Sequence, residues 1–313
     1  LFYISAGRTR DRKLIMLSSG SHTTSEVQYI RSDEPDANWT MVLPRVQDRE
    51  YDVGHRNGLF YLRINDTGRN FRLVSVSVKS PVLSTAVEII PHDEHVMLED
   101  FDLFAGHYVV QERRQGLPGI RIVEYESGNS RSITFPEPVY EAYTSVNIEW
   151  DTRQLRYGYQ SLVTPSSVYE YDLDTAESKL LKQTEILGGY DASLYESERR
   201  FATATDGTQI PVSIVSRKDR SSHGDAPTLL IGYGSYGWAY PVTFSSTRLS
   251  LLDRGVTFAI AHIRGGGEMG KPWHDQGRMM SKLNTFTDFI DVARFLNDAG
   301  YTSTEKLIVE GGS

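Results

Sequence analysis

The chain ends on a segment, Gly311-Gly312-Ser313, that matches the first half of a serine-nucleophile motif. In the full Gly-x-Ser-x-Gly motif the serine sits on a strained turn between a strand and a helix, and glycines are needed because there is no room for neighbouring side chains. The apolar run Leu307-Ile308-Val309 directly before it predicts a buried strand. Ser313 is therefore a candidate nucleophile, with an ordinary loop as the alternative.

A glycine-rich segment, Gly232-Tyr233-Gly234-Ser235-Tyr236-Gly237, follows an apolar run that ends at Ile231. A loop after a buried parallel strand lies at the carboxyl edge of the sheet, where ligands bind. In α/β-hydrolases one oxyanion donor comes from such a loop, and a tyrosine hydroxyl can be that donor. The alternative is a turn whose tyrosines pack against the sheet. A phosphate-binding loop is disfavoured, because neither its Lys-Ser/Thr ending nor the spaced dinucleotide glycines are present.

A third segment, Arg264-Gly265-Gly266-Gly267-Glu268, also follows an apolar run, Gly255 to Ala261. Three successive glycines allow a close approach of the backbone or a positive φ. Arg264 and Glu268 could bind a substrate terminus, or they could form a structural ion pair with each other. Both are kept as candidate substrate-binding residues.

Three histidines, His223, His262 and His274, are candidate general bases by residue type alone. In α/β-hydrolases the triad runs in the order Ser, acid, His, so the base is expected after Ser313, outside this chain. His274 is expected to be structural. No group of His, Asp and Glu has metal-ligand spacing, and we expect neither a metal nor a cofactor.

The elements that would position these segments form a strand–helix–strand pattern. A helix is expected from Thr285 to Ala299, with Asn284 as its N-cap and Gly300 at its end. Its predicted apolar face contains Phe286, Phe289, Ile290, Ala293 and Leu296. With the three buried strands, this pattern predicts that residues 196–313 are the start of an α/β domain with a parallel sheet.

The first two thirds of the chain contain a repeat. Four units each show an apolar strand, a polar turn and a second strand, and the equivalent positions Leu59, His107 and Leu155 are spaced by 48 residues. A period of about 40–50 residues with several strands per unit is typical of a β-propeller. A β-sandwich with similar hairpins is the alternative. We assign residues 1–195 to a partial propeller, because four units are expected to be part of a larger ring.

Composition excludes several other classes of protein. The net charge of −8 disfavours nucleic acid as the partner and tolerates cationic substrates. The absence of cysteine excludes disulfides and thiolate metal sites. No apolar run is long enough to span a membrane.

Residues Leu1 to Ser5 are typical of a strand, and both chain ends look cut. The cytoplasm is the expected compartment, with the periplasm as the alternative.

Taken together, the motifs resemble the prolyl oligopeptidase family of serine peptidases (family S9), and within it the oligopeptidase B branch (also called protease II). The segments that carry this resemblance are Gly232 to Gly237, Arg248 to Gly255, Arg264 to Glu268, Asn284 to Phe289 and Gly311 to Ser313, with Thr23 to Val27, Phe60 to Arg63, Leu155 to Tyr159 and Leu181 to Glu185 in the propeller part. The resemblance implies an α/β-hydrolase domain capped by a seven-bladed propeller that admits only short peptides. It also implies Ser313 as nucleophile and Tyr233 as oxyanion donor, with the triad Asp and His beyond the chain.

The resemblance further implies hydrolysis of short peptides after Lys or Arg. The principal acidic residues of the specificity pocket would follow Ser313, and the chain by itself, lacking a base, is expected to be inactive. Pro241 and Thr243 stand where further acidic residues are expected, which weakens a preference for dibasic sites. The alternatives are a prolyl- or acylaminoacyl-specific peptidase of the same family, or a non-catalytic propeller that binds a protein partner.

Overall fold

The computed structural model describes residues 2–220, 224 and 226–312. The chain divides into two compact units, and each is described by itself. The first contains residues up to 112 together with 119–133 and 146–155. The second contains residues 113–118, 134–145 and the chain from 156 onward.

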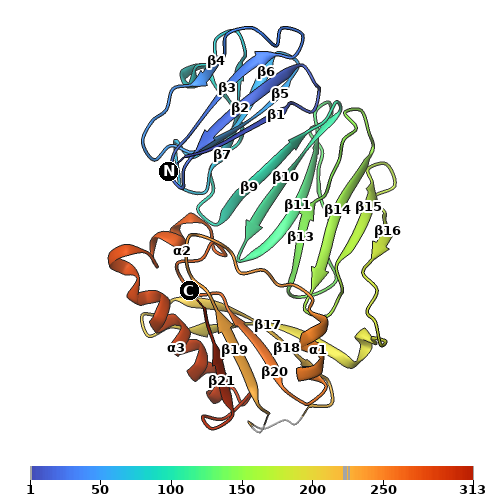
Figure 1. The fold of residues 1–313 in the computed structure, drawn as a ribbon, viewed down its shortest axis with the longest axis vertical. Helices are drawn as coiled ribbons and strands as arrows, with labels where there is room; N and C mark the ends of the chain where they lie inside the picture. The colour runs from blue at the N-terminus through green and yellow to red at the C-terminus, as the bar shows by residue number, and fades with distance from the viewer. Residues whose placement is uncertain (1, 221–223, 225, 313) are drawn as a thin grey trace. The chain divides into compact units, whose positions relative to one another are not determined.

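Four four-stranded sheets account for most of the chain before residue 184 (Figure 1). The strands are β1 (Tyr3–Arg8), β2 (Leu14–Gly20), β3 (Ser25–Arg31) and β4 (Thr40–Leu43); β5 (Tyr51–Arg56), β6 (Leu59–Ile64), β7 (Arg72–Ser77) and β8 (Val87–Ile90); β9 (Val96–Leu103), β10 (His107–Arg114), β11 (Leu117–Glu124) and β12 (Ser130–Ser132); and β13 (Tyr140–Thr144), β14 (Gln154–Ser161), β15 (Ser167–Asp172) and β16 (Ser178–Gln183). Neighbours in each sheet are consecutive in sequence, and pairs such as β2 with β3 run antiparallel. Sheets of this kind fit a β-propeller.

The predicted repeat corresponds to the two central strands of each sheet. Leu59 and His107 are the first residues of β6 and β10, and Leu155 lies at the start of β14. Of the outer strands, the sequence predicted only β1, in part, through the strand expected at Leu1 to Ser5, because many outer strands lack the apolar alternation on which the prediction depends. Every residue of β1 and of β16, for example, is exposed. The number of blades in a closed ring stays a prediction.

Within the first unit, consecutive sheets share their hydrophobic cores. Leu14 and Val27 of the first sheet pack in one cluster with Phe60 of the second. Tyr51, buried in β5, accepts hydrogen bonds from the backbone N–H groups of Val27 and Leu43 and donates one to the carbonyl of Leu43 at 2.7 Å. A buried tyrosine needs such partners for its hydroxyl, so this side chain joins the second sheet to the first.

A mixed five-stranded sheet follows in the second unit, in the order β17-β18-β20-β19-β21 (Figure 1). Its strands are β17 (Tyr195–Thr203), β18 (Gln209–Arg217), β19 (Thr228–Gly232), β20 (Thr257–Ala261) and β21 (Leu307–Glu310). The helices are α1 (Ser246–Leu252), α2 (Lys271–Asp275) and α3 (Leu283–Asp298), and short 3₁₀ turns span Leu83–Thr85, Ala192–Leu194 and Met279–Ser281. Strands β20, β19 and β21 are parallel, which confirms the predicted strand–helix–strand unit.

The helices α1 and α3 pack on opposite faces of this sheet. Leu230 and Ala259 belong to the cluster that contains Leu296 of α3. Phe258 and Ile260 belong to the cluster that contains Leu252 of α1. Adjacent strand residues point to opposite faces, so β20 contributes alternately to the two cores and is buried along its whole length.

The helix expected from Thr285 to Ala299 corresponds to α3, but three details of its prediction were wrong. The helix begins at Leu283 and not at Thr285, and Lys282 is its N-cap. Asn284 does not cap it, because its side-chain amide donates to the carbonyl of Gln276 at 2.8 Å. Phe286 and Ile290 are exposed, whereas Val292 joins Leu296 on the buried face.

The strand β21 is not buried as predicted. Ile308 and Val309 are both exposed, because β21 lies at the edge of the sheet described here. The helices α1 and α2 were not predicted; at seven and five residues they are too short to show a clear period. None of the helices in the described part of the chain has the length and apolar character needed to cross a membrane.

Candidate active site

The parallel strands bring the three glycine-rich segments to one edge of the sheet. In the registers of β19 with its two neighbours, Gly232 pairs with Ala261 and Ile231 pairs with Glu310. The backbone therefore leaves the sheet at the same level before Tyr233, His262 and Gly311, and β19 is the central strand of the three. Ser313 lies outside the described residues, so its role stays a prediction.

The loop after β19 holds its two tyrosines in different surroundings. The ring of Tyr233 is partly buried and packs edge-on against Trp238, with 5.4 Å between ring centroids. Tyr236 is exposed and has a positive φ of 59°. Tyr233, the residue that the family resemblance indicated, is therefore the more constrained of the two.

Glycine is required where this loop meets the loop after β20. Gly234 has a φ of 63°, and a Cβ there would lie 2.6 Å from Cγ2 of Thr285 and 2.8 Å from the carbonyl oxygen of Arg264. A Cβ on Gly265 would lie 2.1 Å from the carbonyl oxygen of Gly234. The two backbones are in direct contact, and the N–H of Gly237 donates to the carbonyl of Gly265 at 3.0 Å.

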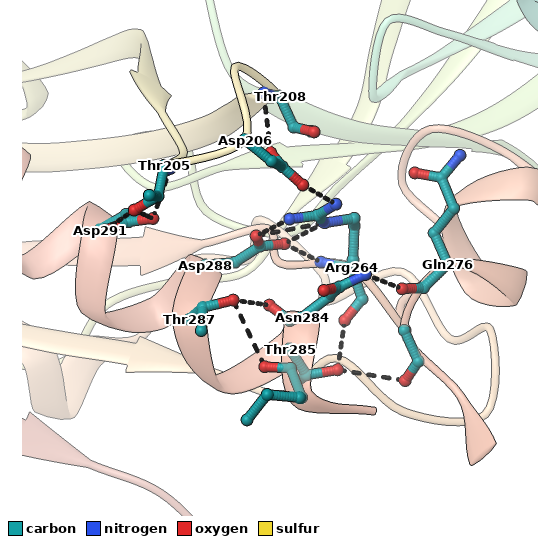
Figure 2. Close-up of polar contacts among 12 residues, drawn as sticks. Thr205, Asp206, Thr208, Arg264, Gln276, Asn284, Thr285, Thr287, Asp288 and Asp291 are labelled. Carbon is teal, nitrogen blue, oxygen red and sulfur yellow. Dashed lines mark hydrogen bonds and ion pairs between the residues drawn. The ribbon is translucent and has the colours of Figure 1, made fainter. Parts of the chain in front are cut away.

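Arg264 is buried between two carboxylates (Figure 2). Its Nη2 donates to Oδ1 of Asp288 at 2.5 Å, and its Nη1 donates to Oδ2 of Asp206 at 2.6 Å. The hydrogen bond to Asp288 raises the pKa of the guanidinium. Hydrogen bonds from Thr208 and Arg264 lower the pKa of Asp206 to about 2. The guanidinium is thus held by residues distant in sequence, and its assignment to substrate binding stays a prediction.

Glu268 lies in a buried hydrogen-bonded series with a histidine and a serine. Its Oε1 accepts the N–H of Tyr240 at 2.9 Å and lies 3.4 Å from Nδ1 of His262. The other ring nitrogen of His262, Nε2, is 2.8 Å from the hydroxyl of Ser213. The connectivity is that of a catalytic triad, but Ser213, His262 and Glu268 are only 2%, 5% and 2% exposed. A substrate cannot reach this serine, so the series is suited to holding β18, β20 and the glycine loop together.

Sequence reasoning missed Ser213 because it lies inside an apolar strand with no motif around it. It also missed Thr285, whose hydroxyl donates to the carbonyl of Arg264 at 2.7 Å and of Gly277 at 3.1 Å. Figure 2 shows Thr285 and Asp288 on α3, below the side chain of Arg264. The only available signal was the run Asn284 to Phe289, which the sequence flagged as part of the family resemblance.

The two other histidines considered as candidate bases, His274 and His223, add no catalytic group to this site. Nδ1 of His274 lies 2.9 Å from the carbonyl oxygen of Gly265, to which it donates, in keeping with the structural role expected for it. His223 lies outside the described residues. Among residues 2–220, 224 and 226–312, no three His, Asp or Glu side chains come close enough together to hold a metal ion.

The chain thus combines four-stranded sheets that fit a propeller with an α/β sheet whose glycine-rich loops meet at its carboxyl edge. This combination defines the class of α/β proteins that carry a β-propeller domain. Residues 1–184 match the model for the prolyl oligopeptidase N-terminal beta-propeller domain, and residues 242–313 match the model for the prolyl oligopeptidase family. The chain belongs to the prolyl oligopeptidase family.

Named relatives agree with this membership. The chain is 41% identical over its whole length to dipeptidyl aminopeptidase BI of Pseudoxanthomonas mexicana and 33% identical to protease 2 of Moraxella lacunata, covering 43% and 45% of those proteins. It is also similar to the structure of oligopeptidase B from Leishmania major, with a TM-score of 0.92 and 33% identity over 99% of this chain and 45% of that one. The chain therefore spans less than half the length of these relatives.

Proposed function

We propose that the protein containing this chain is a serine peptidase that hydrolyses short peptides through an acyl-enzyme. The observation that carries the proposal is the register of β19 with β21, which brings the Tyr233 loop and the Gly311-Gly312 segment to one edge of the sheet. A nucleophile and an oxyanion donor must face the same carbonyl group, and neighbouring parallel strands supply that arrangement. Family membership supports the same chemistry.

In this mechanism the hydroxyl oxygen of Ser313 attacks the carbonyl carbon of the scissile peptide bond. Its proton passes to a histidine, which we expect after Ser313 in the full-length protein, and then to the departing amine. The hydroxyl of Tyr233 donates a hydrogen bond to the oxyanion of the tetrahedral intermediate. Water then hydrolyses the ester between Ser313 and the acyl group.

The domain assignment follows the same proposal. Residues 1–195 are proposed to be later blades of a seven-bladed propeller, and residues 196–313 the opening part of an α/β-hydrolase domain. The match of residues 1–184 to the propeller model supports the first assignment. The family resemblance implies that a propeller of this kind restricts substrates to short peptides.

For specificity, we propose cleavage after Lys or Arg. Support comes from the likeness to oligopeptidase B over 99% of the chain and from a net charge of −8, which suits cationic substrates. A second candidate is removal of dipeptides from a free amino terminus, because the 41% identical relative is named a dipeptidyl aminopeptidase.

The test uses the full-length gene product and three amide substrates: a blocked arginyl amide, a blocked prolyl amide and a dipeptidyl amide with a free α-amino group. We expect the arginyl amide to be hydrolysed fastest of the three, and Ser313→Ala should abolish its hydrolysis. Preference for the free dipeptidyl amide would select the second candidate, and preference for the prolyl amide would contradict both. Equal turnover by Ser313→Ala would refute the nucleophile assignment.

A further inference from the structure

We propose that Lys282 is a positioning residue that holds the Tyr233 loop in the orientation needed for oxyanion binding. This inference rests on the proposed function, because it gives Lys282 a role in the same reaction. Lys282 is the N-cap residue of α3, outside all three glycine-rich segments. Nothing in the sequence marked it as part of a site.

The contacts of Lys282 converge on the residues that directly follow Tyr233. Its Nζ donates to the carbonyl oxygen of Gly234 at 2.6 Å and to the hydroxyl of Ser235 at 2.8 Å. Charged donors make stronger hydrogen bonds than neutral ones, so the ammonium is the stronger of the donors that reach this carbonyl. The hydroxyl of Thr285 reaches the same carbonyl only at 3.5 Å.

The chemistry of this lysine favours a fixed position over an exposed, mobile one. Both acceptors are neutral oxygens, and partial burial lowers the pKa of the ammonium. The side chain therefore gives up hydration in order to bind the loop, a cost that the two short hydrogen bonds offset.

The effect would pass to Tyr233 through the backbone. Gly234 has a φ of 63°, so the chain turns sharply immediately after Tyr233, and the carbonyl that Lys282 binds belongs to the peptide group of that turn. The ring of Tyr233 also packs edge-on against Trp238. Fixing the turn therefore fixes the direction in which the phenol group leaves the backbone, and a shift of about 1 Å in such a group is enough to lower the rate substantially.

The main experiment is a double-mutant cycle on the full-length gene product with Lys282→Met and Tyr233→Phe. Met keeps the length of the side chain but has no N–H group. Tyr233→Phe is expected to lower kcat by about 10²- to 10³-fold. Lys282→Met should lower kcat by about tenfold with KM within about twofold, and its effect should vanish in the Tyr233→Phe background, because residues that act through one group are not additive.

Two further variants separate positioning from a general loss of stability. Lys282→Arg retains donors and should recover most of kcat. Lys218→Met removes an exposed lysine of the same unit and should leave kcat unchanged. Equal effects of Lys282→Met with and without Tyr233→Phe would overturn the inference, whereas Ser313→Ala with full activity would overturn the proposed function instead.

A measurement without catalysis tests the loop directly. Hydrogen exchange at the backbone amides of Gly237 and Trp238, which donate to the carbonyls of Gly265 and Ser235, should be about tenfold faster in Lys282→Met than in wild type, since these hydrogen bonds open more often when the turn is not held. Lys218→Met should leave these rates as they are. Unchanged exchange in Lys282→Met would overturn the positioning role whatever the activity of the protein.

Discussion

Arg264 and Asp288 form a buried pair in which both the side chain and the backbone of the arginine bind one carboxylate. Nε and Nη2 of Arg264 donate to Asp288, and the backbone N–H of Arg264 donates to Oδ2 of the same residue at 3.0 Å. The side chains are 5% and 0% exposed. Asp288 therefore ties the loop after β20 to α3.

Loss of Asp288 should be strongly destabilising. Asp288→Ala leaves the guanidinium buried with only Asp206 as a carboxylate partner, and breaking one side of a buried pair costs about 3–5 kcal/mol. Urea unfolding of the full-length protein measures this cost. Arg294→Ala, which removes an exposed partner of Asp291, is the control and should change the free energy of unfolding by less than about 1 kcal/mol. Similar values for the two variants would contradict the structural importance of the buried pair.

Gly265→Ala should disrupt the site, whereas Gly255→Ala should not. Both glycines have positive φ values, 99° and 81°, so both variants carry a backbone strain of about 1–2 kcal/mol. Only at Gly265 would the new Cβ collide with another backbone, the carbonyl of Gly234; at Gly255 nothing lies within 4 Å. We expect Gly265→Ala to lower both stability and kcat and Gly255→Ala to lower stability alone. Thermal unfolding and steady-state kinetics check this, and equal kcat values would refute the contact.

Ser213 should not be the nucleophile, despite its place beside His262 and Glu268. A fluorophosphonate probe, which reacts with activated serines, should label Ser213→Ala as well as wild type and should fail to label Ser313→Ala. Ser213→Ala should still lose about 1–3 kcal/mol of stability, because Nε2 of His262 loses its buried partner. The reverse labelling pattern would move the nucleophile to Ser213.

Acid should destabilise the first unit through His107. This ring stacks on Phe104 with 4.5 Å between centroids, and both of its nitrogens lack hydrogen-bond partners among the described residues. Burial, with a smaller effect of Arg153, lowers its pKa from 6.5 to about 4. Between pH 6.5 and about 4 the folded state therefore keeps His107 neutral, whereas the unfolded state binds a proton there. The free energy of unfolding is highest above pH 6.5 and decreases as the pH falls toward 4.

The variant His107→Phe checks this dependence, since Phe keeps the stacking but does not titrate. Between pH 7.5 and pH 5 the wild-type protein should lose about 2 kcal/mol more stability than the variant. Denaturation at the two pH values gives the comparison. Parallel losses in the two proteins would show that His107 is not protonated on unfolding in this range.

Local patterns in the sequence were sufficient to predict the order of strands and glycine-rich loops along the chain. Apolar runs before Tyr233, Arg264 and Gly311 were sufficient to predict that each loop follows a strand of a parallel sheet, because strand direction follows from the strand–helix–strand pattern. The 48-residue spacing was likewise sufficient to indicate the central strands of a propeller. The apolar runs are local signals, since each depends on residues a few positions apart, and the repeat compares such local patterns at a fixed spacing.

The partners of the buried charged groups depend on the three-dimensional fold and could not be predicted from the sequence. The sequence suggested Glu268, four residues away, as a partner of Arg264, but the fold brings in Asp206 and Asp288 from β-turn and helix segments far along the chain. In the same way it joins Ser213 to His262 and Lys282 to Gly234. Such pairs depend on strand order, register and helix placement together, which no local pattern of residues encodes.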